Sequence, residues 1–527
     1  MTVLSKPYCE KVIYFLREQK PLFFNIKFCM LHKPIHTLLF LLATLALLAL
    51  MAFVFPKGGI DLGNKMSLAF PTLNSFFEDK PEKTDISKIL AIADANDTII
   101  KIDSVIKPKN DTAKVLAKID SLKPANLNEV AIDTTIKLLT TIQYKSAAKT
   151  AMNNFFNSLT NIANEPKSIR ILHYGDSQIE GDRISDYIRV KLQTQFGGGG
   201  PGLVSLVPIA PSVINRISTS KGWDRYGVFS ARDKRVPHNN FGVMAQLCRY
   251  ANYYSKSDSV SPELAASVKI VTTKNGGPQA ASYNKLKLFY GGAKSKVLCE
   301  FYDGAIFKES DSLQTGGNFN IKEYPVTSLN HEFKFSGYDS PDFYCASLEG
   351  GKGVMVDNMG LRGSSGTFFN QINYGQLKQF YDYLNVKLII LQFGGNTLPY
   401  LKDKEMAGKF GGYLKSQIYT LKKMAPQASI LLIGPSDMSV KVGTEYVTHP
   451  LLEDLRNAIK QAAFDTDCAF FDMYDCMGGK NSMVSWVEKG IAAKDYIHFS
   501  PGGARKIAAL LYSSLISDYN AYVRSKK

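Results

Sequence analysis

The chain has 527 residues, of which 45% are apolar and 21% are charged, and its 63 Lys and Arg against 47 Asp and Glu give a formal net charge of +16. This composition is typical of a globular protein and excludes a wholly disordered or fibrous chain, while the length predicts two or three folded units. An excess of basic residues fits nucleic acid binding, an anionic cell envelope or membrane topology, and the position of the charge distinguishes them.

The charge is unevenly distributed along the chain. Residues 1–57 carry seven basic and two acidic side chains, residues 58–167 carry fourteen and thirteen, and residues 168–527 carry forty-two and thirty-two. The sequence has no run of Lys and Arg with interleaved aromatic residues, which a nucleic-acid surface needs. We therefore expect no nucleic acid partner.

One segment is long enough to span a membrane. Residues 37–55 contain no charge, and 19 residues in a helix extend over about 28 Å. Six basic residues precede this segment, so the positive-inside rule assigns residues 1–36 to the cytoplasm. A cleaved signal peptide is the alternative, although the apolar run is longer than a usual signal core and lacks a small-x-small site at its end. We expect an uncleaved single-pass membrane anchor, with the rest of the chain on the extracytoplasmic side.

Residues 56–135 are rich in Lys, Asp, Thr, Asn and Ala and have few aromatic residues after Phe77. Such a composition buries little apolar surface, so we expect an extended tether.

The sequence pattern changes at Ser168, where short apolar runs typical of strands begin to alternate with helical patterns. Residues 168–174 read as a strand, and residues 386–393 (VKLIILQF) form a near-continuous apolar strand of the kind that is covered on both faces. Residues 136–210 and 350–527 thus predict an α/β three-layer sandwich with a parallel sheet. Residues 211–349 alternate in short runs separated by Gly-Gly turns, and they predict an inserted antiparallel β-sandwich domain.

The cysteines predict neither a disulfide scaffold nor a metal site. The chain has seven cysteines, of which five follow the apolar segment. That number is small for the length, and there is no CxxC motif or Cys/His cluster with metal-ligand spacing. We expect no metal and no organic cofactor.

Three short motifs carry chemistry, each at the end of a predicted strand or the start of a helix. Gly175-Asp176-Ser177 follows the first strand, Gly394-Gly395-Asn396 follows the strongest one, and Asp495-Tyr496-Ile497-His498 precedes the last helix. Alone, each fits a turn or a helix cap. Together they predict a hydrolytic centre in which a carboxylate orients His498 and the imidazole takes the proton of Ser177.

The blocks GDS, GxN and DxxH, together with the longer stretch GDSQIEGDRIS, resemble the SGNH (GDSL-like) hydrolase superfamily, and within it the bacterial cell-wall O-acetylesterases and O-acetyltransferases. The resemblance covers residues 168–210 and about 350–527. It implies that Ser177 is the nucleophile, His498 the general base and Asp495 its orienting carboxylate. It also implies an oxyanion hole made by the Ser177 N–H, Asn396 and the backbone of Gly363, with Gly360 as the alternative.

The inserted β domain resembles the carbohydrate-binding-module-like insert of peptidoglycan acetylesterases. Gln178 replaces the Leu of the name-giving motif, and Thr397 stands where many members have Asp. The resemblance implies an esterase that acts on O-acetyl groups of a cell-envelope glycan such as peptidoglycan. Two alternatives stay open. One is an O-acetyltransferase supplied by a membrane-bound acyl-transfer partner, and the other is a non-catalytic, membrane-anchored glycan-binding protein.

Overall fold

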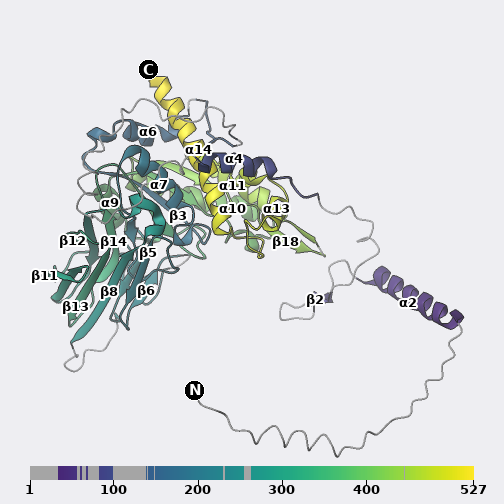
Figure 1. Ribbon diagram of the computed structural model, residues 1–527, viewed down its shortest axis with the longest axis horizontal. Helices are drawn as coiled ribbons and strands as arrows, with labels where there is room; N and C mark the ends of the chain where they lie inside the picture. The colour runs from purple at the N-terminus through teal and green to yellow at the C-terminus, as the bar shows by residue number, and fades with distance from the viewer. Residues whose placement is uncertain are drawn as a thin grey trace, which may run out of the picture. The chain divides into compact units, whose positions relative to one another are not determined.

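The computed structural model describes residues 34–55, 60–61, 67–68, 82–98, 138, 140–147, 149–229, 232–253, 263–443 and 445–526. The chain divides into two compact units, Met1–Asp79 and Lys80–Lys527. The first unit contains one long helix, α2 (Pro34–Val54), and two very short strands that pair antiparallel, β1 (Ile60–Asp61) and β2 (Ser67–Leu68) (Figure 1).

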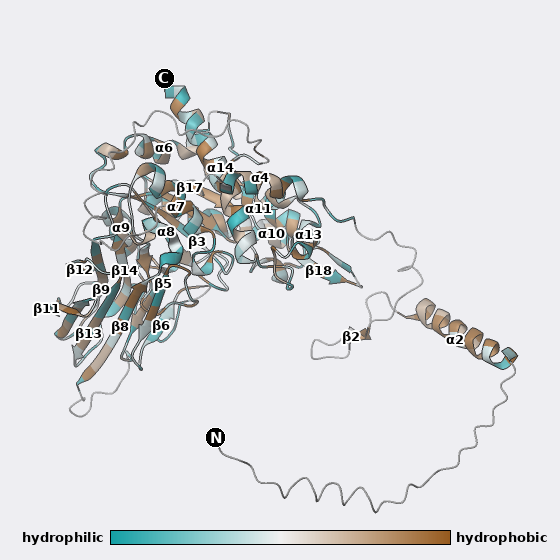
Figure 2. Ribbon diagram, viewed as in Figure 1, coloured by the Kyte–Doolittle hydropathy of each residue, from teal (hydrophilic) through white to brown (hydrophobic). Residues whose placement is uncertain are grey.

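Helix α2 has 21 residues, and nearly all of its apolar side chains are exposed. Figure 2 shows it as an almost uniformly hydrophobic cylinder. It begins three residues before the segment predicted from the sequence, and its length and composition suffice to cross a membrane. A signal sequence has the same properties. The predicted cytoplasmic tail up to residue 33 lies outside the described residues.

The second unit is built around a five-stranded sheet in which every pairing is parallel, as the sequence predicted. Its strand order is β15 (Val354–Gly360), β3 (Ile169–Gly175), β16 (Val386–Gln392), β17 (Ser429–Ile433) and β20 (Ala469–Phe471).

Helices cover both faces of this sheet. Successive side chains of each strand point to opposite sides, and apolar side chains therefore need cover on both faces. On β16, Leu388 and Ile390 belong to one hydrophobic cluster, whereas Ile389 and Leu391 belong to the other. The first cluster contains α6 (Asn153–Thr160), α7 (Ser185–Phe196), α12 (Met473–Met477), α13 (Ser482–Glu488) and α14 (Pro501–Lys526). The second contains α9 (Tyr374–Leu384), α10 (Lys404–Met424) and α11 (Leu452–Asp465). The predicted three-layer α/β arrangement is therefore present.

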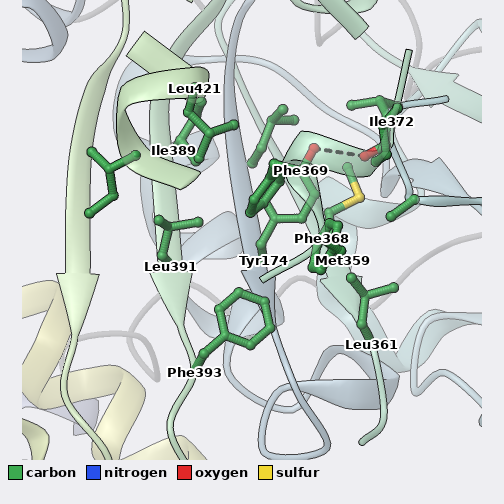
Figure 3. Close-up of a cluster of buried hydrophobic side chains, with 14 of the residues drawn as sticks. Tyr174, Met359, Leu361, Phe368, Phe369, Ile372, Ile389, Leu391, Phe393 and Leu421 are labelled. Carbon is green, nitrogen blue, oxygen red and sulfur yellow. Dashed lines mark hydrogen bonds between the residues drawn. The ribbon is translucent and has the colours of Figure 1, made fainter. Parts of the chain in front are cut away.

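Aromatic rings fill the second cluster close to the ends of β3 and β16. Tyr174 meets Phe369 edge-on with ring centroids 5.1 Å apart, and Phe368 meets Phe393 in the same way at 6.2 Å. Figure 3 shows these rings packed beside Leu391. Because such interiors are as dense as organic crystals, the two strand ends are held in fixed positions.

The strands between β4 and β15 form two antiparallel sheets, as predicted for the insert. One sheet has the order β11 (Ile306–Leu313), β10 (Val297–Asp303), β13 (Asn330–Gly337), β8 (Leu264–Thr272) and β5 (Asn215–Thr219). The other has the order β12 (Asn320–Pro325), β9 (Lys285–Gly291), β14 (Asp342–Glu349), β7 (Gln246–Arg249) and β6 (Asp224–Gly227), and β4 (Gly202–Val204) also pairs with β14. Side chains from both sheets share one hydrophobic cluster. The antiparallel region begins at Gly202, nine residues before the predicted boundary at 211, because β4 pairs with β14.

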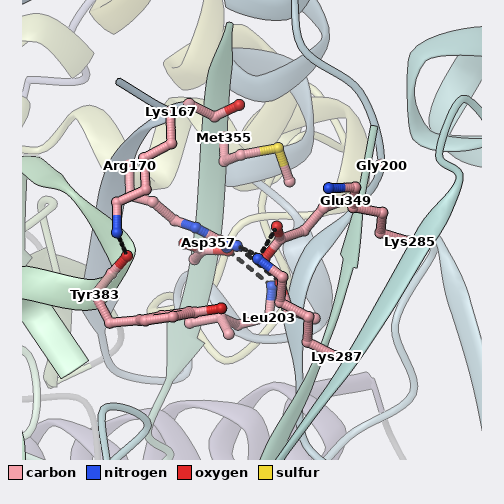
Figure 4. A network of polar contacts seen from close by, with 12 residues as sticks. Lys167, Arg170, Gly200, Leu203, Lys285, Lys287, Glu349, Met355, Asp357 and Tyr383 are labelled. Atoms are coloured by element: carbon pink, nitrogen blue, oxygen red, sulfur yellow. Dashed lines mark hydrogen bonds and ion pairs between the residues drawn. The ribbon is translucent and has the colours of Figure 1, made fainter. Parts of the chain in front are cut away.

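A buried ionic network joins this region to the parallel sheet (Figure 4). The Arg170 guanidinium on β3 contacts Asp357 on β15 at 2.7 Å and also Glu349 at the end of β14. Lys287 on β9 reaches Glu349 at 2.8 Å. Although burial opposes it, the charges of Arg170 and Lys287 lower the pKa of Glu349 to about 2. Removal of one partner from such a network would leave a buried charge unpaired. The network therefore holds the insert against the parallel sheet.

The predicted extended tether at 56–135 is wrong over one stretch. Residues Ser87–Thr98 form helix α4, which contacts α14. Ile86 and Ile89 are buried in the same cluster as α14, and Asp97 accepts hydrogen bonds from Arg505 at 2.8–3.1 Å. Burial of Ile89 within the helix, and of Ile86 directly before it, stabilises α4 against the domain. Residues 99–135 lie outside the described residues.

The remaining short elements are helix α8 (Gly277–Ala280) and a hairpin after β17, formed by β18 (Ser439–Val442) and β19 (Glu445–Thr448). The five cysteines that follow the apolar segment are all buried and free: Cys248, Cys299, Cys345, Cys468 and Cys476.

Candidate active site

The strand order brings two of the predicted motifs and the loop that carries Gly363 to one edge of the sheet. Gly175, at the end of β3, pairs with Gly360 at the end of β15 and with Gln392 at the end of β16. The loop that carries Ser177 therefore lies between the loops that carry Gly363 and Asn396. Carboxyl ends of parallel strands are where open α/β sheets bind their ligands.

Ser177, His498 and Asp495 form a hydrogen-bonded line. The Ser177 Oγ lies 2.8 Å from His498 Nε2, and His498 Nδ1 lies 2.8 Å from Asp495 Oδ2. The other Asp495 oxygen accepts the backbone N–H groups of Ile497 and His498 at 2.9 and 3.0 Å. Partial burial raises the pKa of Asp495, but the hydrogen bonds with His498 and Ile497 lower it more, so the net shift is downward. The Asp495 carboxylate is therefore ionised at neutral pH. Such a line lets the imidazole accept the serine proton.

The backbone around His498 is clamped by Gln178. The Gln178 Nε2 donates to the Ile497 carbonyl at 2.7 Å, and its Oε1 accepts the Phe499 N–H at 3.4 Å. The same Nε2 lies 3.2 Å from Ser436 Oγ, in the loop after β17. From the sequence alone, Gln178 is recognisable only as a departure from a motif. The available signal was its position directly after Ser177.

A second contact holds the other side of this loop. Tyr496 has a φ of 58°, a conformation that non-glycine residues rarely adopt. Its ring stacks on Tyr446 of β19, with centroids 3.7 Å apart and planes 9° from parallel. Its carbonyl accepts the Ser439 N–H at 3.1 Å. The β18–β19 hairpin thereby maintains a strained residue between Asp495 and His498, and sequence analysis did not find Tyr446.

Asp176 is buried beside the candidate nucleophile. One of its oxygens accepts the Gln178 N–H at 2.9 Å and the other accepts Asn396 Nδ2 at 3.2 Å. Burial raises the pKa of Asp176 to about 6, despite hydrogen bonds that favour the charged form. Asp176 thus links the loop after β3 with the loop after β16.

The predicted oxyanion donors differ in their availability. The Asn396 amide nitrogen already donates to Asp176 and, at 3.0 Å, to the Ser364 carbonyl, so a third acceptor has to share or replace one of them. Gly363 has a φ of 81° and open space where a Cβ would lie. A Cβ on Gly360 would lie 2.8 Å from Glu180 Cα, so that glycine is required for close packing. Gly360 thus has a packing role, and Gly363 stays the predicted donor.

The part of the chain that the structure describes contains no group of three or more His, Cys, Asp or Glu side chains placed to hold a metal ion.

No protein-family model matches the sequence, and no curated protein matches it either. Among solved structures, the chain is similar to one described as "Peptidoglycan O-acetylesterase in action, 5 min", with a TM-score of 0.56 and 21% identity over 72% of this chain and 99% of that chain. Two of the other similar structures have low TM-scores. The acetyl xylan esterase AlAXEase gives 0.24, with 17% identity over 31% of this chain and 81% of that chain. A family two carbohydrate esterase from Cellvibrio japonicus gives 0.17, with 10% identity over 48% of this chain and 86% of that chain.

The first of these similarities shows that the chain shares the fold of a peptidoglycan O-acetylesterase. The fold that the resemblance of the three motifs implied is thereby confirmed.

Proposed function

We propose that this protein is a serine esterase that removes O-acetyl groups from a cell-envelope glycan such as peptidoglycan. The observation that carries the proposal is the 2.8 Å contact between Ser177 Oγ and His498 Nε2, in line with Asp495. This contact provides a nucleophile, a base and an orienting carboxylate at the edge of an α/β sheet.

In the proposed reaction, Ser177 Oγ attacks the acetyl carbonyl carbon while His498 takes its proton. The carbonyl oxygen becomes an oxyanion, for which the Ser177 and Gly363 N–H groups and the Asn396 amide are the proposed donors. When the carbon–oxygen bond to the sugar breaks, His498 returns the proton to the leaving hydroxyl. Water then attacks the acetyl-serine and loses a proton to His498. The bond between the carbonyl carbon and Ser177 Oγ breaks, His498 returns the proton to Ser177 Oγ, and acetic acid leaves and ionises to acetate. Each oxyanion donor contributes about 3 kcal/mol to the transition state.

The proposed location is the periplasmic face of the inner membrane, with α2 as the anchor. Six basic residues before the apolar segment, and the length of α2, support this topology. A carbohydrate-binding role of the antiparallel insert is part of the same proposal, and it is supported by the position of the insert beside the site.

The test compares the purified chain without residues 1–55 with its Ser177→Ala variant, on an aryl acetate and on O-acetylated peptidoglycan. We expect acetate release from both substrates by the parent and a loss of at least about a thousandfold in the variant. Equal activity of the two proteins would contradict the proposal. Mass spectrometry of an acetylated Ser177 peptide, with and without a glycan acceptor, tests the intermediate. Transfer of the acetyl group to the acceptor would instead indicate an acetyltransferase with a membrane-bound acyl donor.

A further inference from the structure

Arg362 lies directly before Gly363, on the loop that follows β15. Its guanidinium is held by a forked pair of 2.8 Å hydrogen bonds from Nε and Nη2 to the two oxygens of Glu180. Glu180 also accepts Arg183 Nη2 at 2.9 Å. The Arg362 side chain is nevertheless 54% exposed, and its Nη1 makes no hydrogen bond with the described residues. It is therefore oriented by Glu180 and still able to bind a ligand.

A second arginine approaches the same loop from the insert. Arg225, on β6, is partly buried, and its Nη1 is buried without any hydrogen-bond partner. Its guanidinium lies 5.9 Å from the Phe229 ring centroid. Burial lowers the pKa of Arg225; the Cys248 thiol opposes this shift, and the nearby charge of Arg362 adds to it. Among the residues that the structure describes, no carboxylate forms an ion pair with Arg225.

Two hydrogen bonds tie this part of the insert to the candidate oxyanion hole. The Ser364 Oγ donates to the Phe229 carbonyl at 2.8 Å, and the Ser364 carbonyl accepts the Asn396 amide at 3.0 Å. Phe229 contacts both the Arg225 guanidinium and Ser364, so Arg225 approaches the loop that carries Arg362 and Gly363.

The described residues leave the half-buried Arg225 without a carboxylate partner, but they pair the arginines that are fully buried. Three of these each have a carboxylate at 2.7 Å: Arg170 with Asp357, Arg189 with Asp182, and Arg249 with Asp342. A partly buried charge without a partner costs stability, and placing Arg362 nearby adds repulsion. An arrangement that is unfavourable in the free protein becomes favourable when a ligand supplies the anion.

We propose that Arg225 and Arg362 bind a carboxylate of the glycan, placed next to the acetyl ester that Ser177 attacks. Planar guanidinium groups match the geometry of a carboxylate better than other cations do. The inference rests on the proposed esterase function and narrows its substrate class to acetylated sugars that carry an acidic group. It also gives the insert a part in recognition at the site itself.

The experiment uses two substrates that differ only in charge, O-acetylated N-acetylmuramic acid and the same sugar with its carboxylate converted to a carboxamide. We expect the parent to prefer the acid by at least about tenfold in kcat/KM, mainly through KM. Arg225→Met and Arg362→Met should each bring this ratio close to one, and Arg225→Lys should restore part of it. The matched control is Lys269→Met, which removes an exposed positive charge from β8 and should leave the ratio unchanged.

Two further measurements separate this inference from the proposed function. The deacetylated acid and carboxamide sugars are titrated into Ser177→Ala by calorimetry, which needs no turnover. Equal Kd values for the two sugars would overturn the inference. Tighter binding of the acid that persists when Arg225→Met is added to Ser177→Ala would overturn it too. Absence of esterase activity with tighter binding of the acid would overturn the proposed function alone. The Tm of Arg225→Met should not fall, because the replaced charge has no partner; a large fall would assign Arg225 a structural role instead.

Discussion

The side-chain amide of Gln178 donates a 2.7 Å hydrogen bond to the backbone carbonyl of Ile497, although 319 positions separate the two residues. Gln178 follows the candidate nucleophile directly, and Ile497 precedes the candidate base directly. One side chain therefore connects the backbones of both reacting groups and sets the distance between them.

Replacing Gln178 by Leu should lower kcat with little change in KM. Leu fills a similar volume but cannot bond to the Ile497 carbonyl or the Phe499 N–H, so the His498 loop loses its fixed position. We expect a fall in kcat of about ten- to a hundredfold on an aryl acetate, since small displacements of reacting groups have effects of that size. Unaltered kcat in a variant of normal Tm would show that the clamp has no role in positioning. Gln178→Asn, which keeps the amide but shortens it, should be less active than the parent.

The stacking of Tyr446 on Tyr496 should also affect kcat, to a smaller extent. An aromatic pair contributes about 0.5–1.5 kcal/mol beyond simple burial. Tyr446→Ala should therefore reduce kcat by no more than about tenfold, whereas Tyr446→Phe keeps the ring and should behave like the parent. Steady-state kinetics of the two variants provide the comparison. A Phe variant as impaired as the Ala variant would mean that the hydroxyl, not the stacking, matters.

Asp176 predicts a pH dependence of stability whose sign follows from its raised pKa. Because the folded pKa of about 6 lies above the ordinary 3.8, the folded chain binds this proton more tightly than the unfolded chain. This contribution is fully present below about pH 4 and is lost as the pH rises through 6, with a size of up to about 3 kcal/mol. Urea unfolding of the parent and of Asp176→Asn at pH 4.5 and 7.5 measures it. From pH 4.5 to pH 7.5, the free energy of unfolding should fall more in the parent than in Asp176→Asn. Equal falls in the two proteins would contradict the raised pKa.

Residues 82–98 should behave as part of the folded domain. Ile86 is 1% exposed within the hydrophobic cluster that contains α14. Ile86→Ala should lower the free energy of unfolding by about 2–5 kcal/mol, the usual cost of such a truncation in a core. Lys88→Ala, an exposed position two residues away, is the control and should change it by less than about 0.5 kcal/mol. Chemical denaturation of both variants tests this, and equal stabilities would indicate that the segment does not pack on α14.

Several features of the fold were predictable because they depend on local pattern. The uncharged run at 37–55, the apolar strand at 386–393 and the alternating runs of the insert each follow from periodicities of side-chain burial. The order of the GDS, GxN and DxxH blocks was enough to choose Ser177, Asn396, Asp495 and His498. Parallel strands place their carboxyl ends at one edge, so residues that follow different strands come together.

The sequence by itself therefore determined the layer architecture and the residues that carry the proposed chemistry. Only the tertiary structure decided what holds those residues and what surrounds them. Four features depend on residues that are distant in sequence. They are the Gln178 clamp, the stacking of Tyr446, the packing of α4 and the Arg225 Nη1 that has no partner among the described residues. No local periodicity records such contacts, because they arise from the way whole layers pack and from which polar groups that packing leaves without a partner.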